Sequence, residues 1–293
     1  MAERLIFCVD GGGTGSRARL VTEGGAAIAA AEAGPCNPTS DLDGAVASVA
    51  ALWSQVSAAA GGTRPEDHLM AIGAAGIVSP PVRRAFHSAL PAFAETHLMS
   101  DGYAALVGAG AGRPCGLVIL GTGAVAHRLM ANGTSLQRDG WGWVGGDRGS
   151  AAWIGRSAVR LTLEARDGLR DATTLTQWVE KVLGASEAAI LDWLQQAGPR
   201  RLASLAPLVT DSAAVGDGLA ASILDRAAEH AALLAASLEL AANDPLYLAG
   251  GVAEIQRSRI EARLGRSFDA PQGDALDGCW RVATGQAPPE CRR

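Results

Sequence analysis

The sequence predicts an α/β protein built from two lobes with an active-site cleft between them, and three observations support this. Apolar runs of strand length end in a glycine-threonine-glycine turn twice, at 13–15 and again at 121–123. The segment 149–241 repeats apolar residues mostly at helical spacing. The stretch AGAGRPCG at 109–116 has the composition of a hinge. We therefore expect one lobe over 1–112, completed by a C-terminal helix at about 274–293, and a second lobe over 113–273.

The first lobe should open with strands rather than with a strand and a helix. RLIFCV at 4–9 is an apolar run of strand length, and the residues after the glycines alternate in polarity as a second strand does. A turn at Glu23-Gly24-Gly25 separates this strand from a third one, AAIAAAEA. The glycine-rich loop therefore joins two strands of an antiparallel hairpin and does not open a helix.

The remaining elements follow from apolar runs, helical periodicity and turn residues. In the first lobe we expect helices at 42–60, 80–91 and 102–110, and strands at 68–76 and 95–100. In the second lobe, the segment from Gly116 predicts a strand, the Gly-Thr-Gly turn, another strand and an Asn-Gly turn. A last strand is expected at 245–251, and the closing helix near Asp274.

Composition excludes several classes of protein. The chain has 293 residues, is 48% apolar and carries a net charge of −5, so it lacks the basic surface that nucleic acids or anionic membranes attract. Its five cysteines never form a CxxC pair, which argues against a disulfide framework or a zinc site and fits a reducing compartment. No secretory signal or membrane-spanning run is visible. We expect a cytoplasmic protein that binds neither nucleic acid nor membrane.

The loop VDGGGTGSRARL at 9–20 predicts a phosphate site of an unusual kind. A Walker A loop is excluded because its lysine is missing, and a dinucleotide fingerprint is excluded because a strand follows the glycines. What remains is a hairpin turn whose backbone N–H groups, with the hydroxyl of Thr14, can cradle phosphate. Asp10 at the strand end could hold Mg²⁺. The alternative is a tight turn with spare glycines, and the second such turn at 121–123 favours phosphate binding.

The short motifs together resemble a known superfamily. DGGGT, an Asp-Gly after a strand, GTG and a late AGG are similar to the ATPase domain shared by sugar kinases, actin and Hsp70. The stretch GWGWVGGDRGSAAWIGRSAV at 140–159 resembles N-acetylglucosamine kinases, and GDALDGCWRVATG resembles bacterial glucosamine kinases. These belong with the BadF/BadG/BcrA/BcrD-type ATPases. The resemblance spans essentially the whole chain and implies a ribonuclease H-like, actin-like ATPase fold.

The resemblance also implies roles for individual residues and an activity. The activity is ATP- and Mg²⁺-dependent phosphorylation of the 6-hydroxyl of glucosamine or N-acetylglucosamine, with Asp101 as general base and Asp10 as the metal ligand. The residues that match sugar contacts are Asn37, Asp101, Gly140, Trp141, Gly142 and Asp147. The residues that match nucleotide contacts are Gly12, Gly13, Thr14, Gly121, Thr122, Gly123, Ala213, Gly250 and Gly251.

Several of these residues also admit a purely structural role. Asp101 could cap the following helix, Asp147 could bond backbone amides in a tight turn, and Asn37 before a proline could be a turn residue. Trp141 could belong to the core, as we expect of Trp143 and Trp153, although its flanking glycines favour a sugar contact. Arg148 stands where the resembled kinases carry an acidic residue, which leaves the choice of amino sugar open.

Two other functions remain open at this stage. The ATPases that activate 2-hydroxyacyl-CoA dehydratases or serve benzoyl-CoA reductases share the nucleotide loops, but they hold an iron–sulfur cluster through cysteines, which have no counterpart here. A non-catalytic sugar or nucleotide sensor is the other alternative, and the presence of Asp101 argues against it. Dimers are common in the resembled family, so a homodimer is a further expectation.

Overall fold

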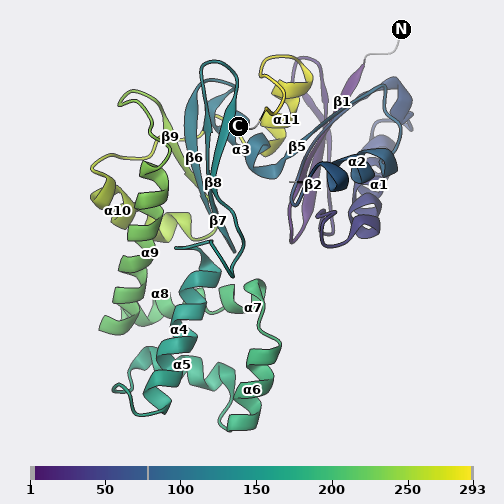
Figure 1. Ribbon diagram of the computed structural model, residues 1–293. Helices are drawn as coiled ribbons and strands as arrows, with labels where there is room; N and C mark the ends of the chain where they lie inside the picture. Colours follow the sequence, from purple (N-terminus) through teal and green to yellow (C-terminus); the bar gives the residue numbers. More distant parts are fainter. Residues whose placement is uncertain (1–3, 78, 292–293) are drawn as a thin grey trace. The chain divides into compact units, whose positions relative to one another are not determined.

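The computed structural model describes residues 4–77 and 79–291, which form two compact units (Figure 1). The first unit comprises the chain up to Gly116, the segment His127–Leu136 and the chain from Ala270 onward. The second unit comprises Leu117–Ala126 and Gln137–Asp269. The chain thus returns to its first unit at its C-terminal end.

The first unit is built on a five-stranded mixed sheet with the order β3-β2-β1-β4-β5. The first three strands pair antiparallel, and β1, β4 and β5 run parallel, so these three strands end at one edge of the sheet. The strands are β1 (Leu5–Gly11), β2 (Ser16–Thr22), β3 (Ala27–Ala33), β4 (Leu69–Ala74) and β5 (Glu95–Ser100). The predicted glycine-rich hairpin between β1 and β2 is confirmed.

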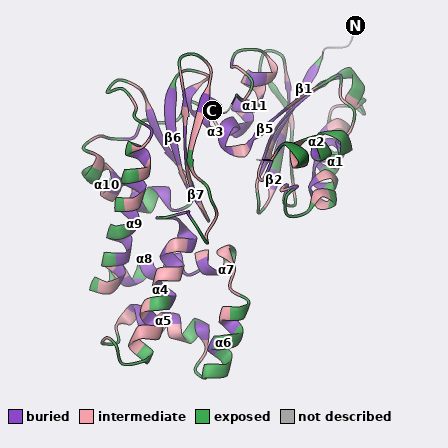
Figure 2. Ribbon diagram, in the orientation of Figure 1, coloured by how far each residue is buried: buried purple, intermediate pink, exposed green. Residues whose placement is uncertain are grey.

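Helices cover this sheet and bury its apolar side chains. Phe7 of β1 packs edge to face on Trp53 of α1, with ring centroids 5.3 Å apart, and stacks on Phe93. Burial is continuous along β4 and interrupted in β1 only at half-buried Asp10, as expected for central strands with both faces covered (Figure 2). The helices are α1 (Leu42–Ala59), the short 3₁₀ helix η1 (Pro65–Asp67), α2 (Pro80–Ala89), α3 (Asp101–Gly110) and α11 (Ala275–Ala283).

Helices α3 and α11 cross at two glycines. A Cβ atom on Gly108 would lie 1.8 Å from the carbonyl oxygen of Asp274, and one on Gly278 would lie 1.9 Å from that of Ala104. Only glycine permits such an approach of two helix backbones. Asp274 caps α11 through the backbone N–H groups of Leu276 and Asp277, so the predicted start of the closing helix is confirmed.

The second sheet has the strand order β8-β7-β6-β9. Its strands are β6 (Cys115–Leu120), β7 (Ala124–Leu129), β8 (Ser135–Asp139) and β9 (Leu246–Ala249). The predicted turn at 121–123 joins β6 to β7. Strand β8 was not predicted, because its sequence SLQRD carries little of the apolar pattern of a strand.

A helical layer makes up most of the second unit, as predicted for 149–241. Its core is rich in alanine and leucine, and small side chains let these helices pack closely. Among the described residues, no helix is long and apolar enough to cross a membrane. The helices are α4 (Ala151–Arg166), α5 (Thr174–Leu183), α6 (Glu187–Gln195), α7 (Pro199–Ala203), α8 (Ala206–Ala214), α9 (Gly218–Ala236) and α10 (Ala253–Leu264).

Candidate active site

The three glycines after Asp10 have three different surroundings. A Cβ on Gly11 would lie 2.9 Å from Sγ of Cys36, and one on Gly12 would lie 2.9 Å from the carbonyl oxygen of Gly15. A Cβ on Gly13 would meet nothing within 4 Å. None of the three needs a left-handed backbone. Gly11 and Gly12 are therefore explained by close packing, whereas the space around Gly13 has room for a side chain.

A cavity of about 310 Å³ lies against this turn within the first unit. It is lined by Asp10, Thr14 and Arg17 among others, and the Thr14 side chain is exposed. Arg17 donates from Nε to Oδ2 of Asp10 at 3.0 Å and pairs with Asp274 at 2.9 Å. An arginine thus stands beside the turn of a chain whose only lysine, Lys181, lies far along the sequence.

Asp10 can contribute to a magnesium site only as a single carboxylate. No cluster of three metal-ligating side chains occurs within 4–77 and 79–291. One carboxylate is nevertheless what Mg²⁺ uses when the phosphates and water supply its other ligands. The Asp10 side chain is 24% exposed beside a turn of backbone amides, so it fits this arrangement.

Asp101 lies at the same sheet edge as Asp10. Strands β1, β4 and β5 are parallel, Asp10 is in register with Gly73, and Asp101 directly follows β5. The helix cap is Ser100, whose Oγ accepts from the backbone N–H of Tyr103, so Asp101 is not the cap. Its carboxylate is half-buried and accepts from the N–H of Gly102 at 2.8 Å. A carboxylate at this edge, free of the capping role, can accept a proton from a substrate.

The C-terminal tail fixes the residue that precedes Asp101. Glu290, whose side chain is 3% exposed, accepts from Ser100 N–H at 3.0 Å and from Ser100 Oγ at 2.7 Å. Arg83 lies 3.4 Å from the same carboxylate. Tyr103 donates its hydroxyl to Pro288 O at 2.8 Å. Sequence reasoning missed Glu290 because 190 residues separate it from Ser100 and no motif marks it.

Asn37 has the structural role in a turn that the sequence offered as the alternative to a sugar contact. Its Oδ1 accepts from the backbone N–H groups of Thr39 and Ser40 at 3.1 and 3.3 Å. Gly76, just beyond β4, allows the close approach of this side chain, since a Cβ there would lie 2.1 Å from Oδ1. Asn37 therefore lies near the sheet edge that carries Asp10 and Asp101. A structural turn and a sugar contact are compatible, because Nδ2 makes no hydrogen bond to another residue of the described chain.

The second glycine turn is held by the start of α4. Ala151 N–H donates to Gly121 O at 2.9 Å, and Ala152 N–H donates to Thr122 O at 3.2 Å. Thr122 is exposed, and a Cβ on Gly121 would meet nothing within 4 Å. This turn thus repeats the features of the first: an open glycine and an exposed threonine hydroxyl after a buried strand.

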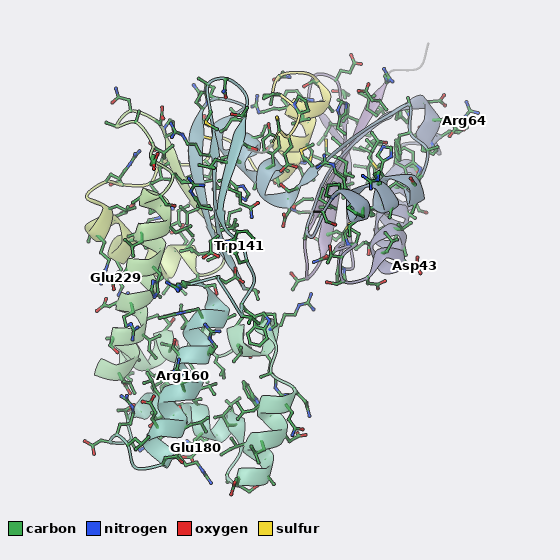
Figure 3. The ribbon with its side chains drawn as sticks, viewed as in Figure 1. Asp43, Arg64, Trp141, Arg160, Glu180 and Glu229 are labelled. Atoms are coloured by element: carbon green, nitrogen blue, oxygen red, sulfur yellow. The ribbon has the colours of Figure 1, made fainter. Side chains whose placement is uncertain are left out.

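The loop after β8 presents Trp141 to solvent. Its side chain is 84% exposed, which excludes the core role, and Figure 3 labels it on this loop. Trp143 and Trp153 instead pack partly buried against the core. Asp139, at φ 58°, organises the loop by accepting from the N–H groups of Trp141 at 3.4 Å and Asp147 at 3.1 Å. Gly140 and Gly142 have φ of 78° and 83°, which favours glycine at both positions.

Asp147 joins this loop to the second glycine turn. Its Oδ1 accepts from Ala124 N–H at 3.2 Å, and its Oδ2 would lie 2.8 Å from a Cβ on Gly123. Burial raises the pKa of the Asp147 carboxyl, the hydrogen bond from Ala124 opposes this, and Asp139 adds to the rise. The backbone-bonding alternative for Asp147 is therefore present in the structure, and a ligand contact would have to use the remaining oxygen.

The Ala-Gly-Gly turn after β9 lies beside the end of β6, where the second glycine turn begins. Val252 N–H donates to Leu120 O at 3.0 Å, and Gly250, at φ 104°, would carry a Cβ only 2.3 Å from that oxygen. Gly251 is exposed with open space around it. The second unit thus brings together Gly121–Gly123, Asp147 and Gly250, while Ala213 is placed near the end of α8, half-buried.

Comparisons with known proteins find a matching family and several similar chains. A model of the BadF/BadG/BcrA/BcrD ATPase family matches residues 8–266. Glucosamine kinase GspK of Vibrio cholerae is 28% identical over 94% of this chain and 94% of its own length. N-acetyl-D-glucosamine kinase of Dictyostelium discoideum is 33% identical over 44% of this chain and 42% of its own. A solved structure from Chromobacterium violaceum, provisionally named an N-acetylglucosamine kinase, superposes with a TM-score of 0.90 at 33% identity, covering 97% and 100% of the two chains.

Proposed function

Because the chain belongs to the BadF/BadG/BcrA/BcrD ATPase family, we propose that it is an ATP-dependent kinase that phosphorylates the 6-hydroxyl of glucosamine or N-acetylglucosamine. The names of the similar proteins support an amino sugar as acceptor. The observation that carries the proposal is Asp101, a half-buried carboxylate at the carboxyl edge of a parallel sheet, released from helix capping by Ser100.

In the proposed reaction the sugar hydroxyl oxygen attacks the γ-phosphorus of ATP, the bond from that phosphorus to the β,γ-bridging oxygen breaks, and ADP leaves. Asp101 accepts the hydroxyl proton as the new bond forms. Each glycine turn by itself is suited to a phosphate group, the first through the exposed hydroxyl of Thr14 and the second through that of Thr122. Asp10, together with the phosphates, would hold magnesium, which would supply charge neutralisation to the transferring group.

The acceptor is assigned to the loop over 140–147. Exposed Trp141 offers a flat ring to the apolar face of a sugar, as aromatic side chains do in carbohydrate sites. Asn37 Nδ2 is suited to a sugar hydroxyl. Arg148, exposed and next to Asp147, would disfavour a positively charged ammonium nearby. This charge favours the N-acetylated sugar over the free amine.

The test is the Asp101→Asn variant in an ADP-release assay with glucosamine and with N-acetylglucosamine. Loss of a general base lowers kcat by about 10²–10⁴-fold, while binding of a non-hydrolysable ATP analogue should be unchanged. Asp43→Asn, an exposed carboxylate on α1, is the matched control and should retain full activity (Figure 3). A kcat for Asp101→Asn within about threefold of the parent would overturn the assignment of the base.

A further inference from the structure

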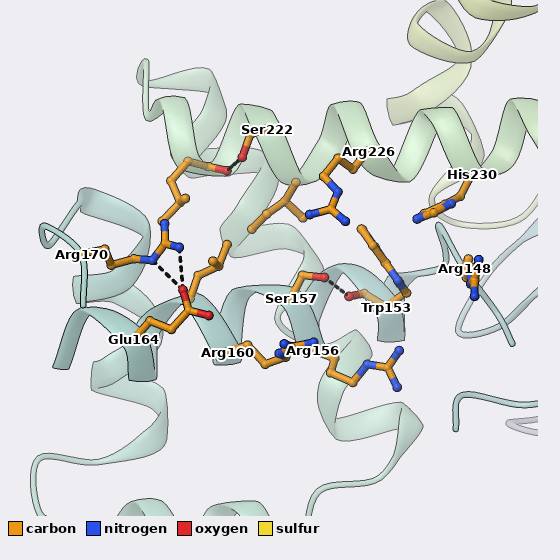
Figure 4. Close-up of a pocket in the computed structure, with 13 residues that line it drawn as sticks. Arg148, Trp153, Arg156, Ser157, Arg160, Glu164, Arg170, Ser222, Arg226 and His230 are labelled. Carbon is orange, nitrogen blue, oxygen red and sulfur yellow. Dashed lines mark hydrogen bonds and ion pairs between the residues drawn. The ribbon is translucent and has the colours of Figure 1, made fainter. Parts of the chain in front are cut away.

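A positively charged groove lies in the helical layer of the second unit, and of its lining residues only Arg148 adjoins the loop assigned to the acceptor sugar. It runs between α4 and α9 and has a volume of about 630 Å³ (Figure 4). None of the proposed nucleotide or sugar residues lines it. Its charged and aromatic lining is Arg148, Trp153, Arg156, Arg160, Glu164, Arg170, Arg226 and His230.

The groove exists because two helices each present one face to it. On α4 the lining side chains recur three or four residues apart, from Trp153 to Glu164, and on α9 they recur in the same way from Leu219 to His230. Arginines at 156 and 160 are therefore neighbours on one helix face. Like charges at this spacing destabilise a helix, so the arrangement costs stability unless something anionic occupies it.

Most of this charge is not neutralised by the protein. Arg170 is paired with Glu164 at 2.5 Å, and Arg156 donates to Trp143 O at 2.8 Å. Within the described chain, no acidic side chain lies within ion-pair distance of Arg148, Arg160 or Arg226. These arginines lie on a chain whose net charge is −5, so the groove is a local reversal of sign.

The His230 side chain lies close to these arginines, and they affect the pKa of its imidazole. Burial is the main cause that lowers the pKa of its imidazole, and Arg148 and Arg226 lower it further. Its ring packs edge to face against Trp153, with centroids 5.1 Å apart, so the Trp153 and His230 rings form an apolar wall at one end of the groove. The groove therefore combines unpaired guanidinium groups with a small apolar surface.

We propose that the groove between α4 and α9 binds a small polyanion that carries two or more phosphate groups. Guanidinium groups match phosphate geometry through paired hydrogen bonds, which makes arginine the preferred residue for such recognition. A volume of about 630 Å³ is in the range of sites for small organic ligands and exceeds what one phosphate ion needs. This inference does not depend on the proposed kinase reaction.

The test measures binding of two probes to the intact chain by isothermal titration calorimetry. Inorganic tripolyphosphate represents a free polyphosphate, and fructose 1,6-bisphosphate represents a phosphorylated metabolite. The double variant Arg160→Gln/Arg226→Gln should weaken the preferred probe about tenfold or more, because each charged hydrogen bond contributes about 1.5–3 kcal/mol, equivalent to roughly tenfold in Kd. Arg160→Lys/Arg226→Lys keeps the charge and should lie between the parent and the glutamine variant.

The matched control is Arg84→Gln/Arg113→Gln, which removes two exposed arginines of the first unit and changes the net charge equally. The control should bind both probes like the parent. Binding that is equally strong in all variants would place the anion at another site, such as a glycine turn, and would overturn the proposal. The proposal would also be overturned if neither tripolyphosphate nor fructose 1,6-bisphosphate bound to the parent chain.

Discussion

At the scale of single residues, neighbouring glycines of the first turn have different surroundings, so different reasons explain why each position is a glycine. A Cβ on Gly11 would lie 2.9 Å from Sγ of Cys36 and 3.2 Å from the carbonyl oxygen of Gly73, whereas a Cβ on Gly13 would meet nothing within 4 Å. The sequence DGGGT shows three identical residues, so pattern alone cannot tell which glycine serves packing and which serves a ligand. Their surroundings in the structure differ, with packing contacts at Gly11 and open space at Gly13.

We predict opposite outcomes for alanine at these two positions. Gly11→Ala should lower the free energy of unfolding by about 1–3 kcal/mol, because its methyl group must displace Cys36 or the strand beside it. Gly13→Ala should leave the melting temperature unchanged and weaken binding of an ATP analogue about tenfold, because the methyl group would occupy the phosphate position. Thermal unfolding and calorimetric titration of both variants check this. Unchanged nucleotide affinity in Gly13→Ala would remove that glycine from the phosphate site.

The candidate site residues could be predicted from sequence motifs. The residues that hold the backbone around them by hydrogen bonds could not. Asp101, Trp141 and the two glycine turns stand out because composition and spacing there are unusual. Asp139 and Glu290 act by hydrogen bonds to backbone N–H groups, a role that any acidic residue in a loop could fill, and so they carry no signal in the sequence.

At the scale of elements, helix α9 depends on one buried carboxylate. Asp217 is 8% exposed and accepts from the N–H groups of Leu175 at 2.7 Å, Leu219 at 2.9 Å and Ala220 at 3.0 Å. It therefore caps α9 and also ties α9 to the start of α5. Burial alone would raise the pKa of this carboxyl, but the hydrogen bonds, led by that of Leu175, outweigh it and hold the pKa below its usual range.

We predict that Asp217→Ala destabilises the protein by about 2 kcal/mol at neutral pH, through the lost cap and the unpaired N–H groups. A carboxyl with a lowered pKa in the folded state stabilises above its unfolded pKa, and this contribution disappears as the pH falls through the folded pKa. The difference between parent and variant should therefore shrink as the pH falls from about 5 to 3. Urea unfolding across this range measures it, with exposed Asp167→Ala as the control. A pH-independent difference would contradict the assigned hydrogen bonds.

Helices and strands with a clear period of apolar residues could be predicted. Strand β8, which depends on its neighbouring strand, could not. The β1–β2–β3 arrangement follows from alternation around turn residues, and the helical segment follows from its apolar spacing. Helix α3 begins at Asp101, one residue earlier than predicted, because Ser100 rather than a later residue is its cap. Strand β8 is polar and half-buried, and it is specified by its neighbour in the sheet rather than by its own composition.

At the scale of the whole molecule, the predicted fold class and family are confirmed. The superposition on the Chromobacterium violaceum protein has a TM-score of 0.90 and covers 97% of this chain. The family model matches residues 8–266. Two sheets, each followed by a glycine turn at the end of its central strand, could be inferred from the repeat of strand, glycine turn and strand. The return of 270–291 to the first unit has a partial signal in the closing helix, but the contacts of Pro288 and Glu290 have none.

This return of the chain leads to a prediction about Glu290, which we infer is a positioning residue for Asp101. Its buried carboxylate holds the N–H and Oγ of Ser100, the cap of the helix that begins with Asp101, and pairs with Arg83. Glu290→Gln removes the charge and leaves one acceptor oxygen. We expect a loss of about 1–3 kcal/mol in the free energy of unfolding, because a buried charged hydrogen-bond network is broken.

The same variant should lower kcat about tenfold without changing KM for ATP, because a shift of about 1 Å at Asp101 misaligns the proton acceptor but leaves the glycine turns intact. Steady-state kinetics at a temperature well below the melting point, with Glu23→Gln as an exposed control, separates the two effects. A melting temperature that falls while kcat stays at the parent value would mean that Glu290 only stabilises the first unit. A parallel rise in KM for ATP would instead place its influence on the nucleotide, since the defect would then extend from α3 to the turn after β1.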